Sequence, residues 1–203
     1  MPTPRRSQTE RSQSTQTALI TAARTLFAEQ GYAAVPADEI VRAAGVTRGA
    51  LYHHFGDKQG LFRAVIEQLE TEITEEITAV VEAADDPWTA AIAALTRFLD
   101  LCVRPDVVRI SLTDALSVLG WQEWRELEQR YGLGLITEIL EAAAADGRLI
   151  AVPIPELAQL VLSACGEAAL MIAHAEDPEA AKVKSLQALV GLLSGLVKDS
   201  TVS

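Results

Sequence analysis

Residues 37–54 constrain the fold most, because they predict two short helices joined by a turn of three residues, Gly45 to Thr47. Gly45 suits the positive φ that a tight turn requires, and Thr47 can cap the second helix with its hydroxyl. The apolar residues that can pack the two helices against each other at an angle are Ile40, Ala44, Val46 and Leu51. This arrangement is a helix-turn-helix, whose second helix presents its N-terminal residues to a major groove.

The second helix, residues 48–54, offers the two kinds of contact that such a helix needs. Arg48 is the one long donor able to reach a guanine edge with two hydrogen bonds. Gly49 and Ala50 have small side chains, so the helix backbone can approach the bases closely. The side chains that can donate hydrogen bonds to phosphate oxygens are Thr47, Tyr52, His53 and Lys58. A metal pair of His53 and His54 is not expected, because adjacent helical positions point about 100° apart.

The charge of the chain is divided unevenly along its length. Residues 1–66 hold 8 Lys/Arg and 5 Asp/Glu, a net charge of +3, whereas residues 67–203 hold 9 and 23, a net charge of −14. The overall net charge of −11 therefore comes from the later part. This asymmetry suggests that the N-terminal end meets an anion while the rest keeps the protein soluble.

Apolar residues spaced three and four apart, with few alternating β-branched runs, predict an all-α protein of about nine helices. Residues 1–14 are polar and weakly basic, and we expect a disordered arm there. A small three-helix domain over residues 15–62 precedes a larger helical domain over residues 63–203, and a long fourth helix from Asp57 joins them. Later helices are predicted near residues 87–103, 105–119, 121–145, 154–175 and 178–198.

The stretch from Thr17 to Phe62 resembles the DNA-binding domain of tetracycline-repressor (TetR) type regulators. The resemblance rests on "AARTLFAEQGY", "DEIVRAAGVTRGALYHHF" and "DKQGLF", in that order and spacing. It implies a ligand-responsive transcriptional regulator, most often a repressor, which binds a palindromic operator as a homodimer and is released by a small effector. It also implies that residues 63–203 form the effector-binding and dimerisation domain.

Carried over by position, the resemblance assigns roles to individual residues. Those facing the bases are Arg48, Gly49 and Ala50. Those touching the DNA backbone are Thr47, Tyr52, His53 and Lys58. His54 matches a family histidine that partly supports the helix and partly contacts phosphate. Pro36 departs from the family pattern, because a Thr or Ser usually opens the second helix, so a hydroxyl cap and a phosphate contact are lost there.

Two apolar stripes in the last two helices suggest a dimer interface, although the same stripes could face their own core. The first stripe consists of Leu157, Leu160, Val161, Ala164, Ala168, Met171 and Ile172. The second consists of Leu186, Leu189, Val190, Leu193, Leu196 and Val197, with Gly191 and Gly195 permitting close approach. The family resemblance favours a homodimer formed by residues 154–175 and 178–198 of each copy.

Bulky side chains between the linking helix and this helix pair could line a ligand pocket, or could simply form the core. The bulky candidates are Trp88, Phe98, Cys102, Trp121, Trp124 and Tyr131. Arg97, Arg109 and Asp114 are candidate polar anchors. Because the bulky candidates carry no charge, we expect a small, mostly apolar effector.

No catalytic, metal-binding or nucleotide-binding motif accompanies these features, so we expect neither enzyme activity nor a cofactor. Cys102 and Cys165 lie in apolar helical patterns without metal-ligand spacing, which indicates buried reduced thiols. The polar N-terminus and the interrupted apolar stretch at 157–175 indicate a cytoplasmic protein without a membrane span. Two other classes remain open: a small-molecule carrier or enzyme with a vestigial N-terminal domain, and a protein-binding adaptor.

Overall fold

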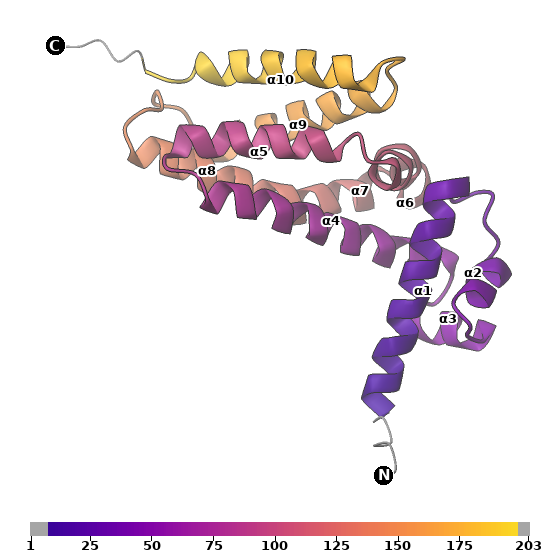
Figure 1. The fold of residues 1–203 in the computed structure, drawn as a ribbon. Coiled ribbons are helices and arrows are strands. Elements are labelled where there is room, and N and C mark those ends of the chain that lie inside the picture. The colour runs from indigo at the N-terminus through magenta and orange to yellow at the C-terminus, as the bar shows by residue number, and fades with distance from the viewer. Residues whose placement is uncertain (1–7, 199–203) are drawn as a thin grey trace. The chain divides into compact units, whose positions relative to one another are not determined.

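The computed structural model describes residues 8–198, and these residues are helical apart from the connecting turns (Figure 1). The α-helices are α1 (Gln8–Gln30), α2 (Ala37–Ala43), α3 (Arg48–Phe55), α4 (Lys58–Glu82), α5 (Pro87–Leu101), α6 (Ala115–Leu119), α7 (Trp121–Glu128), α8 (Gly134–Ala145), α9 (Ile154–Ala173) and α10 (Pro178–Ser194). Two stretches have π-helical geometry, η1 (Val107–Asp114) and η2 (Gln129–Leu133). Since η1 continues into α6, and η2 joins α7 to α8, the described residues form nine continuous helical segments. The predicted all-α fold is confirmed.

The start of the first helix differs from the sequence prediction. Residues 8–14 were expected in the disordered arm, but they form the first turns of α1. This segment lacks glycine and proline, so nothing in it interrupts a helix that continues through Gln30. The remainder of the predicted arm, residues 1–7, lies outside the described residues.

The chain divides into two compact units, and the division differs from the expected boundary between residues 62 and 63. The first unit contains residues 8–69 together with 105–120, and the second contains residues 70–104 and 121–198. The boundary therefore falls inside α4. The segment 105–120 belongs to the first unit because η1 packs against α1, and Val107 and Ile110 of η1 are buried. An ion pair of 2.7 Å between Arg24 and Asp106 also holds it against α1.

The core of the first unit is built around three aromatic rings. The ring centroid of Phe27 lies 5.6 Å from that of Tyr32 and 5.3 Å from that of Phe62. Phe27 and Phe62 are both fully buried. The buried aliphatic side chains of α1 to α4 in this unit include Leu19, Ala23, Ile40, Leu51, Leu61, Val65 and Ile66. This core fixes α2 and α3 against α1 and the start of α4.

The turn after α1 is held by the segment that returns from later in the chain. Gly31 has φ of 80°, and a Cβ at this position would lie 1.9 Å from Nη2 of Arg109. The backbone N–H of Tyr32 donates to Asp114 at 2.7 Å, and the carboxylate of Asp114 also pairs with Arg109 at 3.5 Å. Gly31 therefore meets two demands, a left-handed backbone and space for an arginine.

The second unit packs α5, α8, α9 and α10 side by side (Figure 1). Its buried cluster consists of Leu95, Leu99, Cys165, Ala168, Ile172 and Leu189. Cys102 and Cys165 are free thiols, and burial raises the pKa of each to about 12, so both remain protonated at neutral pH. By length and composition alone, α9 could cross a membrane, but it also packs as a core helix with six buried residues.

Candidate nucleic-acid interface

The turn between α2 and α3 is formed by local signals that the sequence identifies. Gly45 has φ of 66°, and the hydroxyl of Thr47 accepts a hydrogen bond of 3.3 Å from the N–H of Ala50. The predicted cap of α3 is thus confirmed. Pro36 precedes α2 in extended conformation and provides no side-chain cap, although its carbonyl accepts from the N–H of Glu39 at 3.0 Å. The loss of a hydroxyl at this position leaves the helix intact.

The first residues of α3 are exposed while the middle of the helix is anchored. Thr47, Arg48 and Gly49 are exposed and Ala50 is partly buried, whereas Leu51 is fully buried in the core. Anchoring through Leu51 gives the N-terminal turn of α3 a fixed position on the surface. A helix held in this way presents its first turn outward, which is the requirement for entry into a major groove.

Arg48 makes two side-chain contacts that the sequence analysis did not identify. Its Nη1 donates to both carboxylate oxygens of Asp38 on α2, at 3.1 and 3.4 Å, and its Nη2 donates to the hydroxyl of Tyr52 at 3.1 Å. The hydrogen bond with Tyr52, followed by the charge of Asp38, raises the pKa of Arg48. The guanidinium is therefore charged and held between α2 and the next turn of α3.

The two adjacent histidines have different surroundings. His53 is exposed, whereas His54 is partly buried and its Nδ1 lies 3.4 Å from Nε2 of Gln16 on α1. The two imidazole rings lie 5.0 Å apart, edge to face. Within residues 8–198, no group of three or more His, Cys, Asp or Glu side chains could hold a metal ion. His54 links α3 to α1, and His53 points into solvent.

Lys58, at the start of α4, has structural contacts in addition to its predicted role. Its ammonium donates to the carbonyls of Tyr32 and Val35, at 3.0 and 2.9 Å, and lies 4.0 Å from the centroid of the Tyr32 ring. Partial burial lowers its pKa. Asp57 caps the same helix by accepting from the N–H of Gly60 at 2.7 Å. Lys58 therefore fastens the loop between α1 and α2 to α4.

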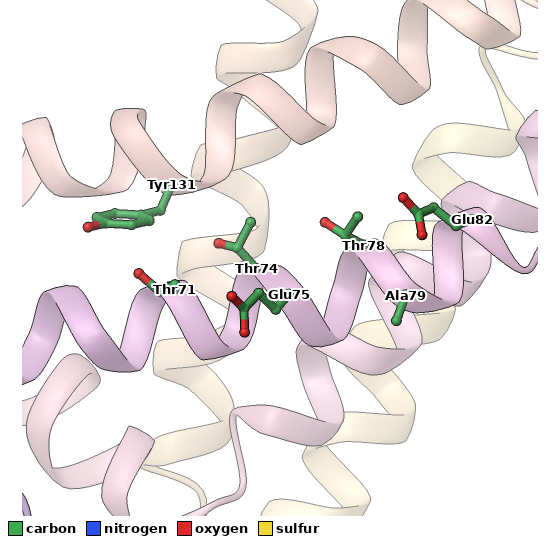
Figure 2. Close-up of a pocket in the computed structure, with 7 residues that line it drawn as sticks. All are labelled: Thr71, Thr74, Glu75, Thr78, Ala79, Glu82 and Tyr131. Atoms are coloured by element: carbon green, nitrogen blue, oxygen red, sulfur yellow. The ribbon is translucent and has the colours of Figure 1, made fainter. Parts of the chain in front are cut away.

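The second unit contains a groove along α4 of about 380 Å³. Figure 2 shows Tyr131, from η2, lying across from Thr71 and Thr74 of α4. The complete lining consists of Thr71, Thr74, Glu75, Thr78, Ala79, Glu82 and Tyr131. Tyr131 alone among the predicted pocket residues lines this groove. The sequence does not identify the α4 residues as pocket residues, because threonines and glutamates on one face of a helix are also typical of a solvated surface.

The other predicted pocket residues lie elsewhere. Trp121 is 67% exposed, and Trp88 and Trp124 are partly buried. Phe98 packs against the core cluster of the second unit, and Cys102 is buried. Asp114 and Arg109 belong to the first unit, where they hold the turn after α1. Arg97 pairs with Glu76.

Family models cover most of the chain. Residues 19–65 match the model described as bacterial regulatory proteins, tetR family. Residues 88–196 match the model described as tetracyclin repressor-like, C-terminal domain. The first match contains the entire helix-turn-helix, and the second spans more than half of the chain.

Individual relatives agree with the family models. The transposon Tn10 TetC protein of Escherichia coli is 32% identical over 142 residues, covering 70% of this chain and 72% of that protein. A TetR-family transcriptional regulator from Pectobacterium atrosepticum is 33% identical, with a TM-score of 0.85 over 95% of this chain and 98% of that one. FadR from Bacillus subtilis, solved with stearoyl-CoA, has a TM-score of 0.69 at 18% identity, over 86% of this chain and 97% of that chain, and shows the shared fold alone.

Proposed function

The chain belongs to the TetR family of DNA-binding transcriptional regulators, and from this premise we propose that it represses transcription as a homodimer bound to a palindromic operator. The observation that carries this proposal is the capped first turn of α3, exposed on a unit whose core fixes its position. The matched family is one of regulatory proteins, and we propose that this member acts in the cytoplasm and is not an enzyme.

The proposed DNA contacts follow from exposure and hydrogen-bonding capacity. Arg48, Gly49 and Ala50 face the bases, where Arg48 donates to a guanine edge and the small residues allow close approach. The proposed backbone contacts are Thr47, Tyr52, His53, His54 and Lys58. Lys58 uses two of its three ammonium hydrogens on carbonyls, which leaves one for a phosphate.

The proposed dimer interface lies on α9 and α10, where several large apolar side chains are exposed. Its residues are Leu160, Leu170, Met171, Val183 and Leu192. Ala168, Ile172 and Leu189, from the predicted stripes, are buried in the unit's own core, so only part of each stripe is available to a partner. A Cβ added at Gly191 would meet nothing within 4 Å, which leaves room for another backbone. A dimer would place two α3 helices on half-sites about 34–36 Å apart.

The groove along α4 is the proposed effector site. Tyr131 and Ala79 provide apolar surface for the effector that we propose. Although threonines and the glutamates Glu75 and Glu82 contribute to it, the surface that lines the groove is mainly apolar, as the sequence suggests for the effector. An effector that favours the form unable to bind DNA by about 2.7 kcal/mol would lower operator affinity about 100-fold.

Selection from random DNA duplexes tests the proposed function. Purified protein is incubated with the duplex pool at about 0.15 M ionic strength, and the bound fraction is sequenced. Enrichment of a palindrome with half-sites about one helical turn apart is the expected result. A pool without an enriched motif would contradict the proposal and would favour a ligand carrier or a protein adaptor.

A further inference from the structure

We propose that Asp38 is a specificity-determining residue for DNA binding, because it positions the guanidinium of Arg48 at the base-contacting turn. This inference rests on the proposed function, in which Arg48 contacts a base. Asp38 does not itself contact a base in this proposal. It affects base preference through Arg48 alone, and its charge also weakens binding to every sequence by repelling the phosphate backbone.

The guanidinium of Arg48 is held by hydrogen bonds to two side chains, Asp38 and Tyr52. Nη1 of Arg48 lies 3.1 and 3.4 Å from the two oxygens of Asp38, and Nη2 lies 3.1 Å from the hydroxyl of Tyr52. The side chains of Arg48 and Asp38 are 59% and 60% exposed. Ion pairs as exposed as this one contribute little to folding stability. The main consequence of the Arg48–Asp38 ion pair is therefore the orientation of the guanidinium and not the stability of the fold.

Holding Arg48 reduces the entropy that it loses on binding DNA. A free arginine samples many rotamers, and fixing one of them opposes binding. A guanidinium has five N–H bonds, more than these contacts require, so a free edge remains for a guanine. Because the hydroxyl of Tyr52 accepts from Arg48, its own hydrogen is free to donate to a phosphate oxygen. The three side chains thus connect a base contact to a backbone contact.

The carboxylate of Asp38 also weakens binding to every sequence. Nonspecific binding depends on attraction between protein cations and phosphates, and Asp38 weakens that attraction at the first turn of α3. At the correct base, the hydrogen bonds of the positioned Arg48 offset this repulsion. At a wrong base the repulsion remains uncompensated. The repulsion lowers affinity for every sequence alike, so the discrimination comes from the hydrogen bonds of the Arg48 that Asp38 positions.

The test compares Asp38→Asn with Glu39→Gln in the full-length protein. Glu39 lies on the same turn of α2 and accepts from Gln30 rather than from Arg48, so its substitution removes one charge without releasing the arginine. Affinities are measured by fluorescence anisotropy on the operator selected by the wild-type protein. They are also measured on operators with each substituted base pair and on a random duplex.

Both substitutions are expected to raise affinity for the random duplex. Only Asp38→Asn should lower discrimination at one base pair of each half-site, by about fivefold or more, as expected for partial loss of one base contact. Glu39→Gln should leave every discrimination ratio unchanged. Equal base preferences in the two variants would overturn the role of Asp38. Failure of the wild-type protein to select any operator would instead refute the proposed function.

A double variant separates positioning from a general change in the domain. In a background of Arg48→Ala, Asp38→Asn should cause no further loss of discrimination, because the residue it positions is absent. An additional loss in the double variant would show that Asp38 acts independently of Arg48 and would overturn the proposal. Thermal unfolding of all variants, expected within a few degrees of wild type, checks that each one is folded.

Discussion

The two units of the chain differ in how their distant segments are joined. In the first unit, Arg24 and Asp106, which are 82 residues apart in the chain, form an ion pair in which each side chain is only 20% exposed. In the second unit, helices pack through apolar side chains, and its long-range ion pairs have a more exposed partner: Asp100 is 41% exposed in the pair with Lys182, and Arg148 is 46% exposed in the pair with Asp86. In the first unit, which carries the proposed DNA-binding surface, long-range polar contacts therefore add to the apolar core, whereas the second unit depends mainly on how its apolar side chains divide between core and surface.

Replacement of a core aromatic residue should have the largest effect on the first unit. Phe27→Ala removes a fully buried ring that contacts two other rings, and we expect the free energy of unfolding to fall by about 3–5 kcal/mol. Trp121→Ala, in the second unit, removes a side chain that is 67% exposed and should cost less than about 0.5 kcal/mol. Urea unfolding followed by circular dichroism measures both. Equal losses would contradict the described packing.

Charges placed at the exposed apolar positions of α9 should disrupt the proposed dimer. Leu160→Glu combined with Met171→Glu puts two carboxylates into the interface, and we expect association to weaken by about 2–4 kcal/mol. Leu116→Glu is the matched control, because Leu116 is also exposed but lies on α6 in the first unit. Sedimentation velocity measures the populations of monomer and dimer. A double variant that remains dimeric would place the interface elsewhere.

A matched pair of arginine substitutions compares the polar contacts of the two units. Arg24→Met leaves Asp106 half-buried without its guanidinium, and we expect a loss of about 1–3 kcal/mol in unfolding free energy. Arg148→Met breaks more exposed pairs with Asp86 and Asp146 and should cost at most about 1 kcal/mol. Urea unfolding measures both variants. A larger loss of unfolding free energy for Arg148→Met than for Arg24→Met would contradict the described difference between the two units.

Lys58 combines a structural contact with a proposed phosphate contact. Lys58→Met retains the length of the side chain but leaves the carbonyls of Tyr32 and Val35 without this donor, which should cost about 1–2 kcal/mol of stability. The slope of log affinity against log salt should also fall by about 1 for every sequence tested. Operator titrations over a series of salt concentrations measure this slope. An unchanged slope alongside reduced stability would leave Lys58 with its structural role alone.

Local signals account for the parts of the fold that the sequence predicted well. Thr47 caps α3, Gly45 has positive φ, and Asp57 caps α4, and each acts within a few residues of its own position. The long fourth helix that was predicted from Asp57 is observed as α4, Lys58–Glu82. Such features depend on short-range hydrogen bonds and sterics, which a single sequence displays directly.

Features that depend on distant contacts could not be predicted in this way. Nothing near Asp114 in the sequence indicates that its carboxylate accepts from the backbone N–H of Tyr32, and the sequence predicts a pocket residue there instead. Periodicity also assigned Leu189 and Leu160 to apolar stripes without showing that the first is buried and the second is 68% exposed. The pairing of Arg48 with Asp38 likewise needs the angle between α2 and α3, which only the folded unit supplies.

The most direct test of the account is the base preference of Arg48→Ala on the operator selected by the wild-type protein. We predict a loss of about 1–3 kcal/mol in operator affinity, with preference relaxed at a single base pair of each half-site. A loss of affinity that is equal for every sequence would contradict the account, because Arg48 would then contact only the DNA backbone. An unchanged affinity would exclude this side chain from the interface altogether.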